Sequence, residues 1–275
     1  NNRRIWFAVK QTSPIQFAPP PQPIILASDP IKIEPRQINQ IGQTNQVHNR
    51  PALSTDKKFV ILIPSFNNEK WCEKNINSAL NQDYGSYRII FIDDKSPDNT
   101  YNIVNSVVSA SNKKQICTLL QNTVRQGALS NIYNTIHSHC ADNEIVITLD
   151  GDDWLASNNV LSILNRYYAS DDVWMTYGQY QNYPAGDLGL SKQIPDSIIN
   201  SGNFRGSWYS SHLRTFYASL FKKINKDDLT KDGEFLPMAW DTAMMFPMLE
   251  MSGTHSRFVP NILYIYNLEN PINDH

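Results

Sequence analysis

The sequence predicts an α/β protein built on a mostly parallel, doubly wound sheet, with a less regular C-terminal half. Between residues 57 and 149, short apolar runs alternate with segments of helical periodicity. Polar clusters directly follow three of the apolar runs. The chain has 275 residues and is 41% hydrophobic, which is enough to form a packed core.

The first half reads as four strands and the helices between them. Phe59 to Ile63 (FVILI) is apolar at every position, as is typical of a parallel strand covered on both faces, and Pro64 closes it. Right-handed crossovers would join such strands. In chain order the predicted elements are strand Phe59–Ile63, helix Glu69–Asn81, strand Tyr87–Ile92, helix Asn99–Ala110 with Asp98 as its cap, strand Gln115–Leu120, helix Ser130–Cys140 and strand Glu144–Leu149.

The second half is less periodic, with a long polar loop at its centre. No internal repeat is visible, which favours one domain over residues 57–275. Its predicted elements are helix Asn158–Tyr168, strand Val173–Tyr177, a polar loop with short strands over Tyr180–Ser207, helix His212–Ile224, helix Trp240–Met251 closed by Gly253, and strand Phe258–Tyr266.

Residues 1–56 differ from the rest because they are rich in Pro, Gln, Asn and Ile. Prolines at this density exclude helix and interior strand, so we expect a linker or an extended arm, with one short strand at Arg4–Val9. Such an arm could reach a neighbouring subunit and build a homo-oligomer.

Charge and composition narrow the choice of partners. The formal net charge is -2 and the pI is about 6.3, which argues against nucleic acid as the main partner. No stretch approaches the ~20 apolar residues of a membrane helix, so no membrane span is expected. The three cysteines show neither a zinc pattern nor a disulfide framework, which favours free thiols and a cytoplasmic location.

Asp150-Gly151-Asp152-Asp153 is the strongest chemical signal. Three carboxylates within four residues repel one another unless a cation or water compensates them, and hard oxygen ligands suit Mn²⁺ or Mg²⁺. Gly151 would let the backbone approach a ligand closely. The alternative is a solvated acidic turn that caps the next helix.

Two further polar clusters follow predicted strands. Pro64-Ser65-Phe66-Asn67 follows the first strand, and Asp93-Asp94 follows the second. Ligands of doubly wound sheets bind beyond the carboxyl ends of the strands, so these clusters should meet the acidic turn at one edge. Asp94 is the expected contact to a ribose hydroxyl or a base N–H, and a helix cap is the alternative.

The string from Val60 to Thr100 resembles the opening of family-2 glycosyltransferases of the GT-A fold. That family has an apolar strand, P-x-Y-N, a helix ending in S-x-x-x-Q, and a second strand with D-D-x-S-x-D. The acidic turn then resembles the family's metal-binding D-x-D-D. Here the matching residues are Pro64, Phe66 in place of Tyr, Asn67, Ser78, Gln82, Asp93, Asp94, Ser96 and Asp98.

The resemblance implies an inverting transfer of a sugar from a nucleotide diphosphate sugar, commonly UDP-linked, to a hydroxyl of a glycan, protein or lipid acceptor. Residues 57–153 would bind the nucleotide and residues 154–275 the acceptor. The residues implied for nucleotide and donor binding are Pro64, Ser65, Asn67, Glu69, Asp93, Asp94, Arg125, Asp150 and Asp153. Asp152 would be the main metal ligand, and His275 a further one.

The family's catalytic base lies in an E-D pair at the start of a late helix. Trp240 replaces the Glu here, and Asp241 is retained as the implied base. An ordinary helix cap is the alternative role of Asp241. Trp208, His212, Arg214 and Trp240 combine aromatic rings with polar groups, which suits a sugar or acceptor site, although Trp208 could equally be core.

Two other functions compete with an active transferase. A catalytically inactive GT-A module that binds carbohydrate or protein would be expected to have lost the acidic cluster, which is intact here. A nucleotidyltransferase would open with a Gly-rich phosphate loop after the first strand, and Pro64-Ser65-Phe66-Asn67-Asn68 is not such a loop.

Overall fold

The computed structural model describes residues 56–271. Apart from Asp56, the Pro-rich arm lies outside the described residues, as do the short strand predicted at Arg4–Val9 and the candidate metal ligand His275.

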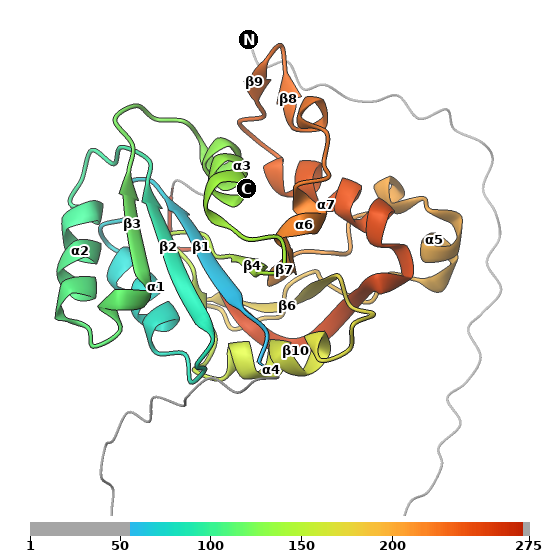
Figure 1. The fold of residues 1–275 in the computed structure, drawn as a ribbon, viewed down its shortest axis with the longest axis horizontal. Helices are drawn as coiled ribbons and strands as arrows, with labels where there is room; N and C mark the ends of the chain where they lie inside the picture. Colours follow the sequence, from blue (N-terminus) through green and yellow to red (C-terminus); the bar gives the residue numbers. More distant parts are fainter. Residues whose placement is uncertain (1–55, 272–275) are drawn as a thin grey trace, which may run out of the picture. The chain divides into compact units, whose positions relative to one another are not determined.

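Within residues 56–271, eight strands form one sheet in the order β3-β2-β1-β4-β7-β6-β10-β5 (Figure 1). A separate two-stranded hairpin, β8–β9, stands apart from it. The strands of the large sheet are β1 (Phe59–Ser65), β2 (Tyr87–Asp93), β3 (Cys117–Gln121), β4 (Ile145–Thr148), β5 (Trp154–Leu155), β6 (Met175–Tyr183), β7 (Arg214–Tyr217) and β10 (Ser256–Asn267), and those of the hairpin are β8 (Thr230–Lys231) and β9 (Glu234–Phe235).

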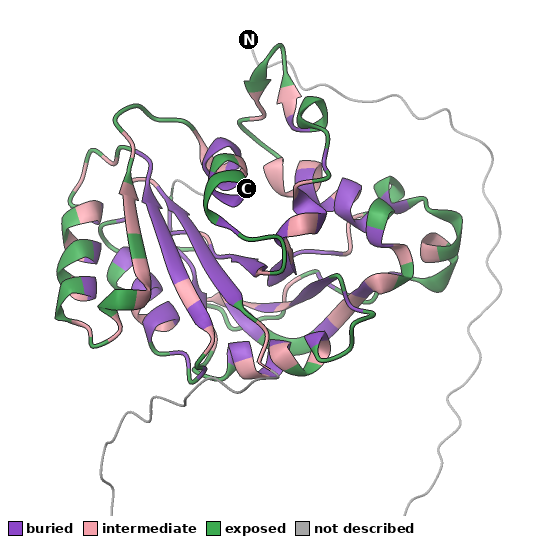
Figure 2. Ribbon diagram, in the orientation of Figure 1, coloured by how far each residue is buried: buried purple, intermediate pink, exposed green. Residues whose placement is uncertain are grey.

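The four strands predicted in the first half pair in parallel, which confirms the predicted sheet. β1 is buried at every residue, and β2 at all but one, which is why both sequences are almost continuously apolar (Figure 2). The register sets Ser65 beside Asp93, at the carboxyl ends of β1 and β2. The polar clusters that follow these strands therefore come together at one edge of the sheet.

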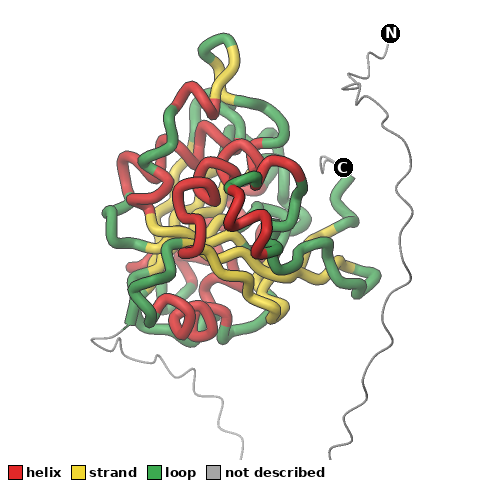
Figure 3. The backbone as a smooth tube through the Cα atoms, turned by 90° about the vertical axis from the view of Figure 1, so that its right-hand side faces the viewer, coloured by secondary structure: helices red, strands yellow, loops and turns green. Residues whose placement is uncertain are grey.

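Helices cover both faces of the sheet (Figures 1 and 3). Alternate residues of β1 point to opposite faces, so that Ile61 packs with α1, α2 and α4 in one core and Leu62 packs with α3, α6 and α7 in the other. The α-helices are α1 (Cys72–Leu80), α2 (Thr100–Ala110), α3 (Ala128–His139), α4 (Val160–Tyr168), α5 (Asp196–Ser201), α6 (Ala218–Phe221) and α7 (Trp240–Ser252). Short 3-10 turns lie at Lys114–Ile116, Phe204–Gly206, Lys226–Leu229 and Gly253–His255.

The helix predicted at His212–Ile224 is wrong over its first half. Arg214–Tyr217 is strand β7, inserted antiparallel between β4 and β6, and only Ala218–Phe221 is α-helical. Leu213, Phe216 and Leu220 are buried, so the apolar pattern correctly marked core residues. The local spacing suits either conformation, and hydrogen bonds to strands on both sides decide for the sheet.

The loop predicted at Tyr180–Ser207 contains strand residues as expected, because β6 continues through Tyr183. It also contains helix α5, which was not predicted. Cys72, Cys117 and Cys140 are free, as expected from their spacing. No helix in the described part of the chain is long and apolar enough to cross a membrane.

Candidate active site

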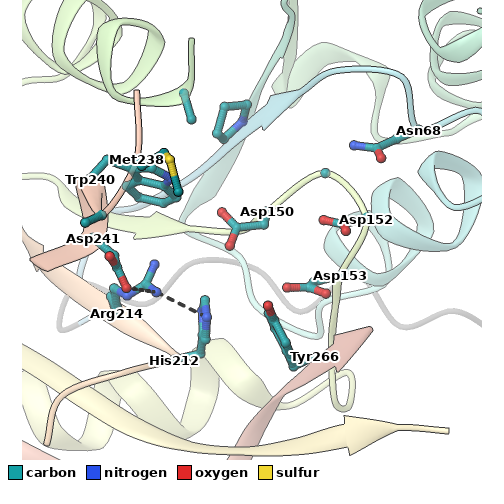
Figure 4. A pocket seen from close by; sticks show the side chains of 14 residues that line it. Asn68, Asp150, Asp152, Asp153, His212, Arg214, Met238, Trp240, Asp241 and Tyr266 are labelled. Atoms are coloured by element: carbon teal, nitrogen blue, oxygen red, sulfur yellow. Dashed lines mark hydrogen bonds and ion pairs between the residues drawn. The ribbon is translucent and has the colours of Figure 1, made fainter. Parts of the chain in front are cut away.

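A cavity of about 410 Å³ lies where β1 and β4 end (Figure 4). Eight of the candidate residues meet in it although they span nearly 180 positions of sequence: Pro64, Asp150, Asp152, Asp153, His212, Arg214, Trp240 and Asp241. The remaining lining residues are Asn68, Ala128, Gly151, Met238, Ala239 and Tyr266. The acidic turn and the residues around Asp241 therefore line one cavity.

Gly151 sets how closely the acidic turn approaches the end of β1. A Cβ atom at this position would lie 2.4 Å from Ser65 Oγ and 2.8 Å from Asn68 Nδ2. Asn68 Nδ2 itself donates to Ser65 Oγ at 3.1 Å, so the three residues form one tight contact. Only glycine allows this approach.

We expect Gly151→Ala to lower the stability of the domain by about 1–3 kcal/mol, because the added methyl group must push two segments apart. For a domain of this size that corresponds to roughly 2–10 °C in the thermal midpoint. Gly206→Ala is the matched control, since its Cβ would meet only Asn203 atoms at 3.5 Å or beyond. Equal thermal midpoints for Gly151→Ala and Gly206→Ala would show that the acidic turn can move aside without a loss of stability.

Asp153 anchors the acidic turn to β10. Its carboxylate accepts hydrogen bonds from Tyr264 Oη at 2.5 Å and from the backbone N of Asn267 at 2.7 Å. Burial, together with the neighbouring Asp152 and Asp150 carboxylates, raises the pKa of Asp153 well above its usual range. Its side chain thus makes internal contacts on both oxygens, which leaves Asp150 and Asp152 as the carboxylates that bear most directly on the cavity.

The surroundings of Asp150 disfavour the ionised form of its carboxyl group. Burial and the carboxylates of Asp152 and Asp241 raise its pKa to about 6, although the Arg214 guanidinium acts in the opposite direction. Asp152 is held in place by Asn270, whose Nδ2 donates to Asp152 Oδ2 at 2.8 Å. A bound cation would relieve the repulsion among these carboxylates.

The donor set suits a hard divalent cation that takes part of its coordination from a ligand. Among residues 56–271, no group of three or more His, Cys, Asp or Glu side chains could by itself hold a metal ion. Mg²⁺ is commonly bound by one or two carboxylates plus substrate phosphates and water, and Asp150 and Asp152 match that description.

Asp241 lies across the cavity in the first turn of α7 (Figure 4). Its Oδ1 accepts a hydrogen bond from the backbone N of Thr242 at 2.8 Å, and its Oδ2 lies 3.4 Å from Arg214 Nη2. The side chain is 30% exposed, so one edge remains accessible from the cavity. Ala239, in the left-handed conformation (φ 53°), begins the helix and turns Trp240 toward the Arg214 guanidinium.

His212 and Arg214 form the buried floor of the cavity on the side of Asp241. Arg214 Nη2 is 3.1 Å from His212 Nε2, and the His212 ring stacks on Tyr264 with ring centroids 4.4 Å apart. Burial and the adjacent Arg214 charge hold the pKa of His212 well below its usual range, so the imidazole is neutral at pH 7. Trp208 does not line the cavity and instead packs edge-on against Phe246 at 5.5 Å.

A smaller cavity of about 120 Å³ adjoins the first, and Pro64 and Ala128 line both. Its other lining residues are Ser65, Phe66, Asp94, Arg125, Gly127 and Asn131. The Arg125 guanidinium lies 3.8 Å from the centre of the Phe66 ring. The predicted nucleotide-side residues Pro64, Ser65, Asp94 and Arg125 are therefore neighbours.

Asp94 organises the wall of the smaller cavity. Its carboxylate accepts hydrogen bonds from Asn122 Nδ2 and from the backbone N–H groups of Gln126 and Gly127, each at 2.8 Å. Burial alone would raise the pKa of Asp94, but these bonds outweigh it and lower the pKa below its usual value. Asp94 is therefore a charged acceptor near neutral pH.

Three other residues predicted to bind the donor do not line these cavities. Asp93 is buried and accepts hydrogen bonds from the Ser96 backbone N and the Gln121 side chain. The backbone N of Asn67, at φ 58°, donates to Ser96 Oγ at 3.0 Å. Glu69 accepts from the backbone N of Asn99 at 3.0 Å, which ties the loops after β1 and β2 together.

The loops after β1 and β2 are also joined by Asp98, the predicted cap of the second helix. Asp98 Oδ1 accepts from the backbone N of Thr100 at 3.1 Å, and Oδ2 accepts from the backbone N of Glu69 at 2.9 Å. The N-cap residue of α2 is Asn99, one residue later than the predicted cap, and Asp98 accepts from the first N–H of the helix.

Sequence reasoning missed the support that comes from the end of the chain. Tyr264, Tyr266 and Asn267 on β10 and Asn270 beyond it surround the acidic turn. Asn68 was missed as well, although it contacts both Ser65 and Asn270. No local pattern marks these residues, because their roles depend on β10 returning to the acidic turn from more than 100 residues away.

Curated relatives include the GalNAc(5)-diNAcBac-PP-undecaprenol beta-1,3-glucosyltransferase of Campylobacter jejuni, 29% identical over 185 residues, which are 65% of this chain and 56% of that protein. The poly(ribitol-phosphate) beta-N-acetylglucosaminyltransferase TarP of Staphylococcus aureus is 26% identical over 180 residues, covering 64% and 51% of the two chains. The chain thus spans about half the length of these relatives.

Solved structures share the fold at low sequence identity. S. aureus TarS in complex with UDP-GlcNAc superposes with a TM-score of 0.59 at 18% identity, covering 78% of this chain and 59% of that one. The mannosyltransferase PcManGT from Pyrobaculum calidifontis, in complex with GDP-Man and Mn²⁺, gives 0.55 at 15% identity, covering 81% and 60%. These are GT-A glycosyltransferases, so the predicted fold is confirmed.

Residues 60–229 match the sequence pattern of glycosyl transferase family 2, and this match covers more than half of the chain, from β1 through the acidic turn to the end of the 3-10 turn before β8. The chain belongs to glycosyl transferase family 2.

Proposed function

We propose that this protein is an inverting glycosyltransferase that moves a sugar from a nucleotide diphosphate sugar, UDP-linked by preference, to an acceptor hydroxyl. The observation that carries the proposal is the pair of adjoining cavities. The smaller one has a charged acceptor and an aromatic ring, and the larger one has carboxylates on two opposite sides. This arrangement suits a nucleoside, a diphosphate and a sugar in sequence.

The nucleoside would lie in the smaller cavity, against Phe66 and Arg125. Asp94 lines this cavity as a charged acceptor, held by Asn122, Gln126 and Gly127, and it would accept from a base N–H or a ribose hydroxyl. Pro64, shared by both cavities, would mark the passage from nucleoside to diphosphate.

Arg125 offers a clean test of the nucleoside site, because its side chain is exposed and supports no core contact. We expect Arg125→Ala to weaken binding of UDP about tenfold, through loss of a planar cation against Phe66 and the base. The thermal midpoint without ligand should not change. Arg166→Ala, at an exposed position of α4, is the control. Isothermal titration measures the UDP affinity of both variants. An unchanged affinity in Arg125→Ala would show that the nucleotide's base binds elsewhere.

The diphosphate would lie over the acidic turn. Mn²⁺ or Mg²⁺ held there by Asp152 and Asp150 would act as a Lewis acid toward the leaving diphosphate. Asp153 would contribute by fixing the turn through Tyr264 and Asn267. His275 stays a candidate ligand from the sequence alone.

Asp241 would be the general base. Its accessible edge faces the cavity from the side opposite to the acidic turn (Figure 4). An acceptor hydroxyl that loses its proton to Asp241 would attack the anomeric carbon from that side, and a single displacement inverts the configuration. Trp240 and Met238 offer apolar surface to a sugar ring, and the Arg214–His212 pair holds the polar floor beneath it.

Binding of a nucleotide with a metal tests the proposal most directly. The thermal midpoint should rise with UDP or a UDP-sugar when Mn²⁺ is present and rise less without it, because a ligand of the native state stabilises by mass action. If no nucleotide shifts the midpoint at millimolar concentration, the protein is instead an inactive GT-A module that binds carbohydrate or protein. A cytoplasmic location and assembly through the N-terminal arm stay predictions from the sequence.

A further inference from the structure

A second large cavity, of about 450 Å³, lies at the opposite end of β4 from the acidic turn. Asp142 and Asn143 come just before β4, Trp174 precedes β6, and Tyr217 ends β7. A strand rises about 3.3 Å per residue, so the five steps from Ile145 to Asp150 separate this cavity from the active site by roughly 15 Å or more. The full lining is Asp142, Asn143, Asp171, Trp174, Tyr217, Ser219, Leu220 and Lys223.

An exposed tryptophan forms one wall of this cavity. Trp174 is 37% exposed. The His255 ring stacks on it, with centroids 4.0 Å apart and planes 6° apart. His255 is itself fixed by Asp172, 2.7 Å from its Nδ1. The indole is therefore held rigidly in place, which lowers the entropy cost of binding a ligand against it.

Tyr217 supplies a second aromatic group. Its ring is half-buried and packs edge-on against Tyr168 at 5.5 Å. Flat rings of this kind stack on the C–H face of a pyranose, while their polar tips remain hydrated. Two restrained aromatic side chains in one cavity favour a ring-shaped ligand with an apolar face.

The charges at the polar rim nearly balance. Asp142 is paired with Lys222 at 2.8 Å, and Asp171 is paired with Lys57 at 3.2 Å, so each lining carboxylate has its own lysine. Lys223, which also lines the cavity, leaves one lysine in excess, and a single lysine does not balance the charge of a diphosphate. The paired carboxylates, together with the Asn143 amide and the Ser219 hydroxyl, can still exchange hydrogen bonds with the hydroxyl groups of a sugar.

We propose that this cavity is a second saccharide site, which binds a neutral oligosaccharide segment of a glycan acceptor. The proposal rests on the proposed transferase function and specifies its acceptor class. A glycan held at Trp174 while its end occupies the active site would be bound at two points. The second contact then benefits from a high effective concentration without any change in the catalytic cavity.

The test uses the full chain labelled with 5-fluorotryptophan and observed by ¹⁹F NMR, with the Trp174 signal identified from its absence in Trp174→Phe. The probes are neutral hexasaccharides of glucose, galactose, mannose and N-acetylglucosamine at millimolar concentration. We expect at least one series to shift the Trp174 signal. In isothermal titration, Trp174→Ala, which lacks this signal, should weaken binding of that hexasaccharide about tenfold or more, and Asn143→Ala about threefold. Tyr101→Ala, which removes a partly exposed ring on α2, should bind as the wild type does.

Donor binding, measured as the UDP-dependent thermal shift, separates this proposal from the proposed function. Trp174→Ala and Asn143→Ala should keep the wild-type shift, which also shows that both variants fold. A normal donor shift with no response of the Trp174 signal to any hexasaccharide overturns the second site and leaves the transferase proposal standing. Hexasaccharide affinity that keeps its wild-type value in both Trp174→Ala and Asn143→Ala also overturns it, because the sugar must then bind elsewhere.

Discussion

Asp152→Asn is expected to abolish sugar transfer and to remove the effect of Mn²⁺ on nucleotide binding. The substitution keeps the size of the side chain and an oxygen that can accept from Asn270, so the turn should retain its shape. It removes one negative charge from the proposed cation site, where a carboxylate is the preferred ligand. Isothermal titration with UDP, with and without Mn²⁺, measures the loss, and a coupled assay for released UDP measures transfer.

Asp227→Asn is the matched control for this change, because Asp227 is exposed in the 3-10 turn Lys226–Leu229, which is not part of either active-site cavity. It should leave both measurements unchanged. If Asp152→Asn binds UDP with the same Mn²⁺ dependence as the wild type, the acidic turn is a structural turn, and the cation site must lie elsewhere.

Asp241→Asn is expected to reduce transfer about 10²–10⁴-fold while leaving nucleotide binding intact, since general base catalysis contributes rate enhancement of that order. Asparagine begins helices as well as aspartate does, so the alternative role of Asp241 at the start of α7 would be preserved. The fall in the transfer rate would then reflect loss of the catalytic base and not a disturbed start of helix α7. Single-turnover transfer at saturating donor measures it.

The pair of variants separates the two sides of the cavity. Asp152→Asn should lose metal-dependent nucleotide binding and Asp241→Asn should keep it, although both lose transfer. Equal loss of nucleotide binding in both would contradict the assignment of Asp241 to the acceptor side. An unchanged thermal midpoint in Asp241→Asn is the control for folding.

The sequence by itself was sufficient for the first half of the fold and for the position of the acidic turn. FVILI and YRIIFI can be buried only between two layers, so their parallel pairing follows from their composition. Ligand sites of such sheets lie beyond the strand ends, which places Asp94 and Asp150 correctly before any coordinates are known.

The acceptor side could be predicted only in part. The first part of the predicted helix His212–Ile224 is strand β7 in the structure, because it forms hydrogen bonds with β4 on one side and with β6 on the other. This insertion brings Arg214 to Asp241 and His212 to Tyr264. Residue type and closeness in sequence had grouped Arg214 with Trp208, which instead packs against Phe246, outside the cavity.

The tertiary structure also decided how the three carboxylates of the acidic turn differ. Charge and spacing alone treat Asp150, Asp152 and Asp153 alike, as repelling neighbours, and only the family resemblance gave Asp152 a separate role as metal ligand. Only the return of β10 gives Asp153 its bonds to Tyr264 and Asn267 and leaves Asp150 with a raised pKa beside the cavity. Local sequence determines which charges are present, whereas long-range packing determines which of them are satisfied internally and which remain for a ligand.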